Sequence, residues 1–205
     1  MTNLEKLKAI RIPLNANDSI AEFISKSDLQ EIKLDVCYAV QNLLDALCID
    51  TIQDHNTRET AKRVSKMLID ETLKGRYHPM PEVTAFPNFK NLDEFFVAGP
   101  IDVKSLCSHH FQPIIGKAWV GIKPGSKVIG LSKYHRLVDW ICRRPQIQEE
   151  MTVMIADEIE KIAETPDVAV IVKAEHFCCK VRGIEQDSMF TTSVMRGIFK
   201  ESHPS

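Results

Sequence analysis

The stretch Val168-Ala-Val-Ile-Val-Lys-Ala-Glu-His-Phe-Cys-Cys179 joins an apolar run to a histidine and two adjacent cysteines. Five consecutive apolar residues after a turn-forming Thr-Pro-Asp predict a strand that is central in its sheet. If the strand continues to His176, adjacent side chains face opposite sides, so only one of Cys178 and Cys179 can point inward without a bulge. The stretch therefore predicts a sheet core and one metal ligand.

A second segment, Cys107-Ser-His-His110, lies about seventy residues earlier. Cys107 and His110 are three residues apart, so one tight turn or a strand end can aim both at one ion. Zinc takes thiolate and imidazole ligands, and a site with three protein ligands keeps a fourth position open for water. The two segments together predict a catalytic zinc site whose third ligand is Cys178 or Cys179.

Disulfides are the alternative use of the six cysteines. The first residues, Met-Thr-Asn-Leu-Glu-Lys-Leu-Lys, lack the apolar region of a secretory signal, which favours a cytoplasmic protein with reduced thiols. The cysteines outside the two segments lie in apolar, helix-like stretches. We expect three of them to be small core residues: Cys37, Cys48 and Cys142.

Composition describes an ordinary soluble globular chain of 205 residues, with 44% hydrophobic residues and a net charge of −2. No run of residues approaches a membrane span, so no membrane partner is expected. A small negative net charge does not favour a nucleic-acid partner. Because the overall charge does not attract phosphate, phosphate binding would require a local cluster of basic residues.

Helical spacing dominates the first part of the chain. The first 25 residues are weakly patterned and are expected to form a loose arm. A long helix from residue 27 or 28 and a second helix, capped by Asn56 and stopped at Gly75, are expected next. The apolar stripe of the long helix is expected to be buried: Leu29, Ile32, Val36, Ala39, Val40, Leu43, Leu44 and Leu47.

Beyond Pro87 the pattern changes to short β-like runs. Strands are expected at residues 95–97, 101–106, 118–122, 127–131, 168–172 and 191–199. Helices are expected at residues 134–142 and from Pro145, which suits the first helical position. The chain therefore reads as an α+β protein with an N-terminal helical part.

Basic residues form a second group. Ser132, Lys133 and Arg136 begin a helix directly after a strand, where backbone N–H groups favour anions. Arg182, Arg63 and Lys66 are further candidates for a polyphosphate site. With the metal ligands, these residues predict a zinc hydrolase that acts on a phosphorylated substrate.

These motifs closely resemble GTP cyclohydrolase I, in order and with compatible spacing, over about residues 56–199. The resemblance rests on five blocks: Cys107-Ser-His-His110, Val128-Ile-Gly-Leu-Ser-Lys133, Arg136, Arg144-Pro-Gln-Ile-Gln-Glu149 and His176-Phe-Cys-Cys-Lys-Val-Arg-Gly183. It implies the α+β tunnelling fold, with an antiparallel sheet and two helices in a catalytic domain of residues 81–205. An N-terminal arm and helices would occupy residues 1–80. It also implies a homodecamer with active sites at subunit interfaces.

The resemblance further implies zinc-dependent hydrolysis of GTP to 7,8-dihydroneopterin triphosphate and formate, the first step of pterin and folate biosynthesis. The zinc ligands would be Cys107, His110 and Cys178, and the acid/base residues His109 and His176. Substrate contacts would come from eight residues: Gln148, Glu149, Ser132, Lys133, Arg136, Arg182, Arg63 and Lys66. The chain departs from the family's usual residues at Ser108 and Ala61.

Two alternatives differ in chemistry. A deazaguanine nitrile reductase of the same fold uses a cysteine nucleophile and a nicotinamide cofactor without zinc, and the retained Cys, His and Cys set disfavours it. In a non-catalytic zinc homologue the metal would only join two strands. Such a closed site needs a fourth protein ligand.

Overall fold

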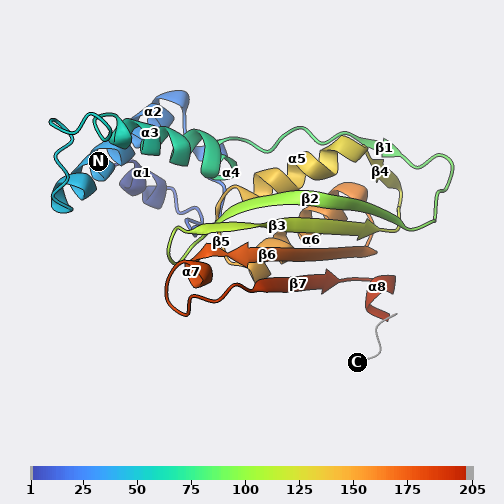
Figure 1. The fold of residues 1–205 in the computed structure, drawn as a ribbon. Coiled ribbons are helices and arrows are strands. Elements are labelled where there is room, and N and C mark those ends of the chain that lie inside the picture. The colour runs from blue at the N-terminus through green and yellow to red at the C-terminus, as the bar shows by residue number, and fades with distance from the viewer. Residues whose placement is uncertain (1, 202–205) are drawn as a thin grey trace. The chain divides into compact units, whose positions relative to one another are not determined.

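The computed structural model describes residues 2–201, and its contacts divide the chain into two units between Pro79 and Met80 (Figure 1). The first unit is helical. Its helices are α1 (Asn3–Ala9), η1 (Ala21–Phe23), α2 (Lys26–Ala46), α3 (Thr60–Lys66), the π-helical η2 (Met67–Thr72) and α4 (Lys74–Tyr77). No helix of residues 2–201 is both long and apolar enough to cross a membrane.

The expectation of a loose N-terminal arm is wrong. Thr2 caps α1 through a capping box, in which its hydroxyl accepts from the Glu5 N–H and the Glu5 carboxylate accepts from the Thr2 N–H. Lys6 then forms ion pairs at 3.3 Å with Asp28 and Glu31 of α2. The weak apolar pattern hid this helix because polar contacts hold it in place.

α2 begins where the pattern predicted, after a second capping box at Ser25. Its apolar stripe is not buried as expected: within the described chain only Leu44 is buried, whereas Leu43 and Leu47 are 57% and 61% exposed. The physical reason is the small partner surface, since α2 packs mainly against α3 and α1.

The predicted second helix is also different. The N–H of Asn56 donates to the side chain of Asp54 in a turn, so Asn56 caps no helix, and α3 begins only at Thr60. Gly75 lies inside α4 and does not stop it. Local side-chain hydrogen bonding at Asp54 thus moved the helix start.

The second unit contains the sheet and its helices. Its elements are β1 (Ala85–Pro87), β2 (Phe96–Cys107), β3 (Pro113–Ile122), β4 (Lys127–Ile129), α5 (Leu131–Cys142), β5 (Pro145–Gln146), α6 (Gln148–Ala163), β6 (Val168–His176), α7 (Phe177–Lys180), β7 (Met189–Met195) and α8 (Ile198–Glu201).

Five strands form the main sheet in the order β5-β2-β3-β6-β7, and β1 pairs with β4. All pairs are antiparallel except the short β2–β5 pair. The expected α+β fold with an antiparallel sheet is confirmed. β6 has hydrogen-bonded neighbours on both sides, so the prediction of an interior strand is confirmed as well.

Several boundaries differ from the prediction, and three of the differences change an element's identity or end it early. The runs at residues 95–97 and 101–106 belong to one strand, β2, whose register shifts between Ala98 and Ile101. Pro145 is not the first residue of a helix: it pairs with Leu106 in β5, and α6 begins three residues later. The last strand ends at Met195, because a backbone turn at Gly197, with φ at 53°, leads into α8.

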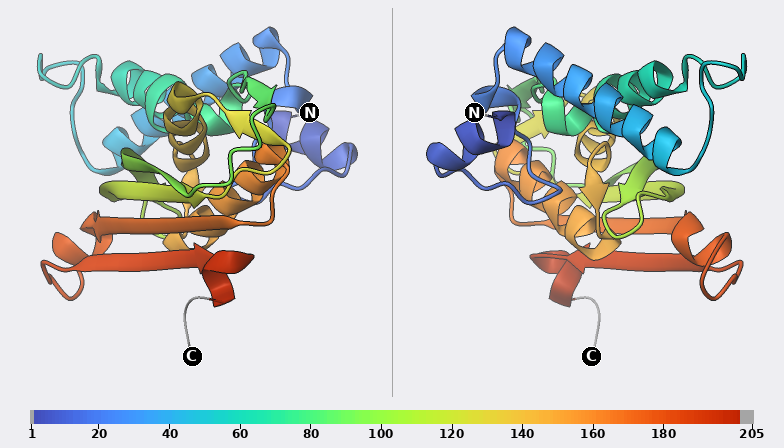
Figure 2. Two further views of the ribbon diagram at one scale, coloured as in Figure 1. Left: turned by 90° about the vertical axis from the view of Figure 1, so that its right-hand side faces the viewer. Right: turned by 90° about the vertical axis from the view of Figure 1, so that its left-hand side faces the viewer.

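The core of the second unit lies between the sheet and α5 with α6. Figure 2 shows both helices on the same side of the sheet. Alternate residues of β6 supply the sheet side, and the helices supply Leu137, Ile141, Ile155 and Ile159, all with no exposed surface. Cys142 joins this core as expected, whereas Cys37 is half-buried and Cys48, at a φ of 58°, is exposed. The core prediction for Cys48 is therefore wrong.

Candidate metal centre

Cys107 and His110 are brought together by the turn that joins β2 to β3. Cys107 is the last residue of β2 and is buried, at 4% exposure. The Phe111 N–H donates to the Cys107 carbonyl at 2.9 Å, and the Cys107 N–H donates to the Gln112 carbonyl at 2.8 Å. These two hydrogen bonds close the turn, so that His110 lies beside Cys107.

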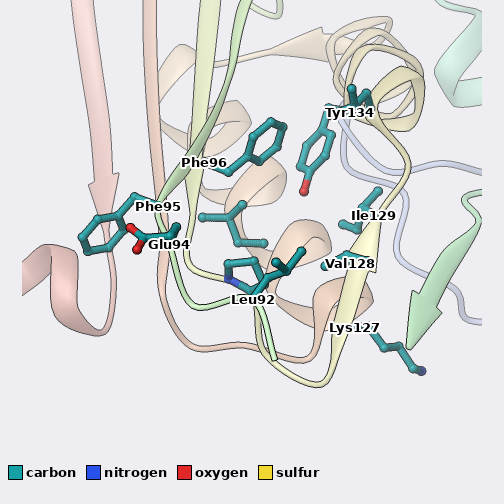
Figure 3. A pocket seen from close by; sticks show the side chains of 11 residues that line it. Leu92, Glu94, Phe95, Phe96, Lys127, Val128, Ile129 and Tyr134 are labelled. Carbon is teal, nitrogen blue, oxygen red and sulfur yellow. The ribbon is translucent and has the colours of Figure 1, made fainter. Parts of the chain in front are cut away.

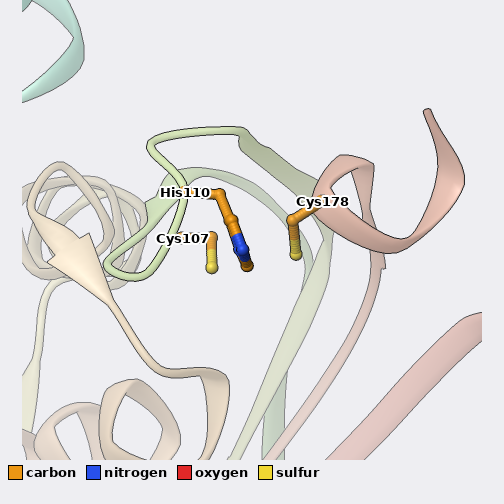
Figure 4. A group of neighbouring side chains, drawn as sticks. All are labelled: Cys107, His110 and Cys178. Atoms are coloured by element: carbon orange, nitrogen blue, oxygen red, sulfur yellow. The ribbon is translucent and has the colours of Figure 1, made fainter. Parts of the chain in front are cut away.

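Cys178 reaches the same point from α7. β6 ends at His176 and a single helical turn follows, so the expected strand does not continue through the cysteine pair. Successive side chains of a helix point about 100° apart, so the side chains of Cys178 and Cys179 point in different directions. The prediction that only one of them faces the site therefore holds for a helical turn as it would for a strand. Among residues 2–201, the metal-competent group here consists of Cys107, His110 and Cys178, whose ligand atoms lie within 4.8 Å of one another. Figure 4 shows the three side chains pointing to the same side.

The electrostatics of the cluster are those of a site that needs a cation. Burial, and then the hydrogen bond with Cys107, raise the pKa of the Cys178 thiol to about 12. The Cys178 thiol therefore resists ionisation in the absence of positive charge, whereas a bound divalent cation favours the thiolate form of its cysteine ligands. Two sulfurs and one imidazole nitrogen are also the donor set that suits zinc.

His109 lies beside the cluster, and His176 is two residues before the proposed ligand Cys178. Nδ1 of His109 lies 3.8 Å from the Cys107 sulfur, and His109 is exposed. His176 is half-buried at the end of β6, and burial lowers its pKa, with the Glu149 carboxylate acting in the opposite direction. The two histidines therefore come from different elements, the β2–β3 turn and the end of β6, and have different surroundings.

Gln148 makes a contact that the sequence did not indicate. Its side-chain oxygen lies 2.6 Å from Nε2 of His176, and its amide nitrogen donates to the carbonyls of Val172 and Phe190 and to the Thr192 hydroxyl. Both the oxygen and the nitrogen of the Gln148 side chain are thus hydrogen-bonded within the chain, and the residue is 2% exposed. Only the register of β6 and β7 against α6 creates this arrangement, so no sequence signal could have found it.

The other predicted site residues fall into three groups. Arg182 joins the cluster, since its guanidinium donates to Nε2 of His110 at 2.8 Å, and Glu149 is exposed at the first turn of α6. Arg63 and Lys66 lie on α3 of the first unit and are exposed. The third group lies at the start of α5: Ser132, Lys133 and Arg136.

The start of α5 lies at the opposite end of the sheet from the cluster (Figure 1). The ring of Tyr134 packs in a tilted arrangement against Phe96, the first residue of β2, with ring centroids 5.5 Å apart, whereas Cys107 is the last residue of β2. A strand of 12 residues is roughly 35 Å long at about 3.3 Å per residue. One copy of the second unit therefore does not place Lys133 beside the cluster. Lys133 instead donates to the Glu82 carbonyl at 3.0 Å.

Comparison with known proteins gives a consistent result. The family model described as GTP cyclohydrolase I matches residues 36–205. A relative from Actinobacillus pleuropneumoniae serotype 5b, named GTP cyclohydrolase 1, is 40% identical over 164 residues, which cover 79% of this chain and 75% of the relative. The relative of the same name from Photobacterium profundum is 38% identical over 173 residues, covering 83% and 79%. A third, from Haemophilus ducreyi, is 40% identical over 162 residues, covering 78% and 74%.

Proposed function

The chain belongs to the GTP cyclohydrolase I family, and from that premise we propose that it hydrolyses GTP to 7,8-dihydroneopterin triphosphate and formate. This reaction is the first step of pterin and folate biosynthesis. The observation that carries the proposal is the cluster of Cys107, His110 and Cys178, with His109 beside it and His176 at the end of β6, two residues before Cys178. A cytoplasmic location is part of the same proposal, because all six cysteines are free thiols.

Zinc is the proposed metal, held by Cys107, His110 and Cys178. The residues fit it: two thiols and one imidazole offer ligand atoms within 4.8 Å, and these three residues are the only metal-competent group in residues 2–201. When bound, zinc lowers the pKa of water and provides a nucleophile near neutral pH. Three protein ligands leave room for that water, which distinguishes this proposal from a closed structural site.

His109 and His176 are the proposed acid/base residues. Attack at C8 of guanine needs a proton donor toward the purine, and exposed His109 beside Cys107 is placed to provide one. His176 would serve the later ring opening or sugar rearrangement. Its Nε2 is already engaged by Gln148, so Nδ1 is the nitrogen left for substrate.

Glu149 is the proposed reader of the guanine base. Its exposed carboxylate can accept from the N1 and N2 edge of guanine, which adenine does not offer. Once a bound base covers the carboxylate, the wrong base would leave it without water and without a partner. Gln148 would assist indirectly: its amide is committed within the chain, and its contribution is to orient His176.

The triphosphate contacts are proposed to come from more than one copy of the chain. Arg182 lies at the cluster, but Ser132, Lys133 and Arg136 begin α5 at the other end of β2. A second copy could present its α5 start to the first copy's cluster, which would complete one site from two chains. This arrangement agrees with the proposed homodecamer with interfacial active sites. Arg63 and Lys66 are proposed to complete the anion site.

A direct assay tests the reaction. Zinc-loaded protein is incubated with GTP, and formate and a fluorescent pterin after oxidation are measured. We expect both products, and an absence of product from the wild type would reject the proposal. NADPH oxidation with a deazaguanine nitrile, without a need for zinc, would instead support the nitrile reductase.

Two variants then separate metal binding from proton transfer. Cys107→Ala should lose zinc and turnover together, because a ligand is gone. His109→Ala should retain zinc and lose turnover. A His109→Ala protein that retains full turnover would remove this residue from the mechanism.

A further inference from the structure

A cavity of about 290 Å³ lies in the second unit at the start of β2, away from the metal cluster. Its wall is largely apolar and comes from β2, the end of β3, β4 and the start of α5 (Figure 3). Phe96, Ile122 and Ile129 form part of this wall. None of the proposed metal ligands or acid/base histidines lines it.

The hydroxyl of Tyr134 points into this cavity. Figure 3 shows its oxygen directed into the space between Phe96 and Ile129. The residue is only 2% exposed, and its ring packs against Phe96 in a tilted arrangement. Among the described residues the hydroxyl has no hydrogen-bond partner. The oxygen faces the cavity and is not sealed in the core, so a ligand in the cavity can take the place of water as its hydrogen-bond partner.

The charges around the cavity are neutralised or directed elsewhere. Lys127 contributes to the wall, but its ammonium is paired with Glu164 at 2.5 Å. Glu94 is exposed and lies beside Phe95, away from Tyr134 (Figure 3). The interior therefore offers one neutral hydroxyl in apolar surroundings. A purine or a phosphate would lose its hydration there without gaining partners.

The size of the cavity limits the ligand further. An apolar protein cavity of roughly 150 Å³ holds a benzene molecule, so a cavity about twice as large suits two fused rings. We propose that this cavity binds an uncharged two-ring aromatic molecule that carries one polar atom to hydrogen-bond the Tyr134 hydroxyl. The cavity is separate from the metal cluster, because its residues lie at the opposite end of β2 from Cys107, but it adjoins the α5 start that is proposed to contact the substrate of a second copy.

The test uses the full-length, zinc-loaded protein and two fluorescent probes, 2-naphthol and naphthalene. We expect 2-naphthol to bind saturably with one site per chain. Tyr134→Phe removes only the hydroxyl and should weaken 2-naphthol about five- to tenfold, the loss of one neutral hydrogen bond. Naphthalene, which has no polar atom, should bind both proteins equally.

Tyr38→Phe is the matched control. Tyr38 is 68% exposed on α2, so removal of its hydroxyl should leave the binding of both probes unchanged. Tyr134→Phe loses no hydrogen bond of the free protein, and its melting temperature should be no lower than that of the wild type. Two results would overturn the proposal: no saturable 2-naphthol binding, as expected if a side chain of another copy fills the cavity, or equal affinity in Tyr134→Phe.

Discussion

Gly116 allows β3 and β6 to approach closely beside the metal cluster. It pairs with Ala174 of β6, which packs with Cys107 and Cys178. A Cβ atom at position 116 would lie 2.1 Å from the Lys173 carbonyl oxygen and 2.5 Å from the Ala174 Cα. These obstacles are backbone atoms of a paired strand, so no side-chain rotation can relieve the clash.

We therefore expect Gly116→Ala to destabilise the protein by about 3 kcal/mol, near the upper end for overpacked sites. For a chain of this size that corresponds to a melting temperature about 6–12 °C lower. Relief of the clash requires β3 and β6 to part by roughly 1 Å, whereas metal–ligand distances vary by only about 0.2 Å. Zinc affinity should consequently fall together with stability.

Gly121→Ala is the matched control, since Gly121 lies on the same strand and also pairs with β6. Its added Cβ would be 3.5 Å from the Ala169 Cβ, an ordinary contact. Thermal unfolding followed by circular dichroism and zinc titration with a competing chelator measure both effects. Equal melting temperatures and equal zinc affinities for the two variants would refute the reasoning.

Three further predictions concern the site and the first helices. Cys178→Ala should reduce zinc from one per chain to almost none, whereas Cys179→Ala should retain it, as measured by elemental analysis; the reverse result would exchange the ligand assignment. When the inactive variants His109→Ala and Lys133→Ala are assembled together in equal amounts, about one quarter of wild-type turnover should return. Random assembly gives about one quarter of the sites an intact His109 from one copy and an intact Lys133 from another. No recovery would contradict a site shared between copies. Hydrogen bonds with Ser25, followed by the contact with Lys6, lower the pKa of Asp28 from 3.8 to about 2. Because the folded value is the lower one, the stability that Asp28 contributes is present above about pH 4 and is lost as the pH falls through 2, so Asp28→Asn should flatten acid unfolding in that window.

Periodicity located most elements of the second unit because it reports local burial. The continuous apolar run of β6 and the helical pattern of α6 each appear within one segment, and both elements form. Prediction was wrong at Pro145 and Asn56, where the residue type suited a helix start. In both cases a competing hydrogen-bond partner, the β2 strand for Pro145 and Asp54 for Asn56, decided the outcome.

The sequence by itself determined the chemistry available to this protein. Thiol, imidazole and guanidinium side chains, in sequence blocks that resemble those of the family, indicate the types of metal ligand and the family. The tertiary structure decided which of them meet: Gln148 holds His176, Arg182 reaches His110, and Lys133 lies at the other end of the sheet. These relations join residues far apart in the chain. They depend on strand register and on helix packing, which a local pattern of residue types does not encode.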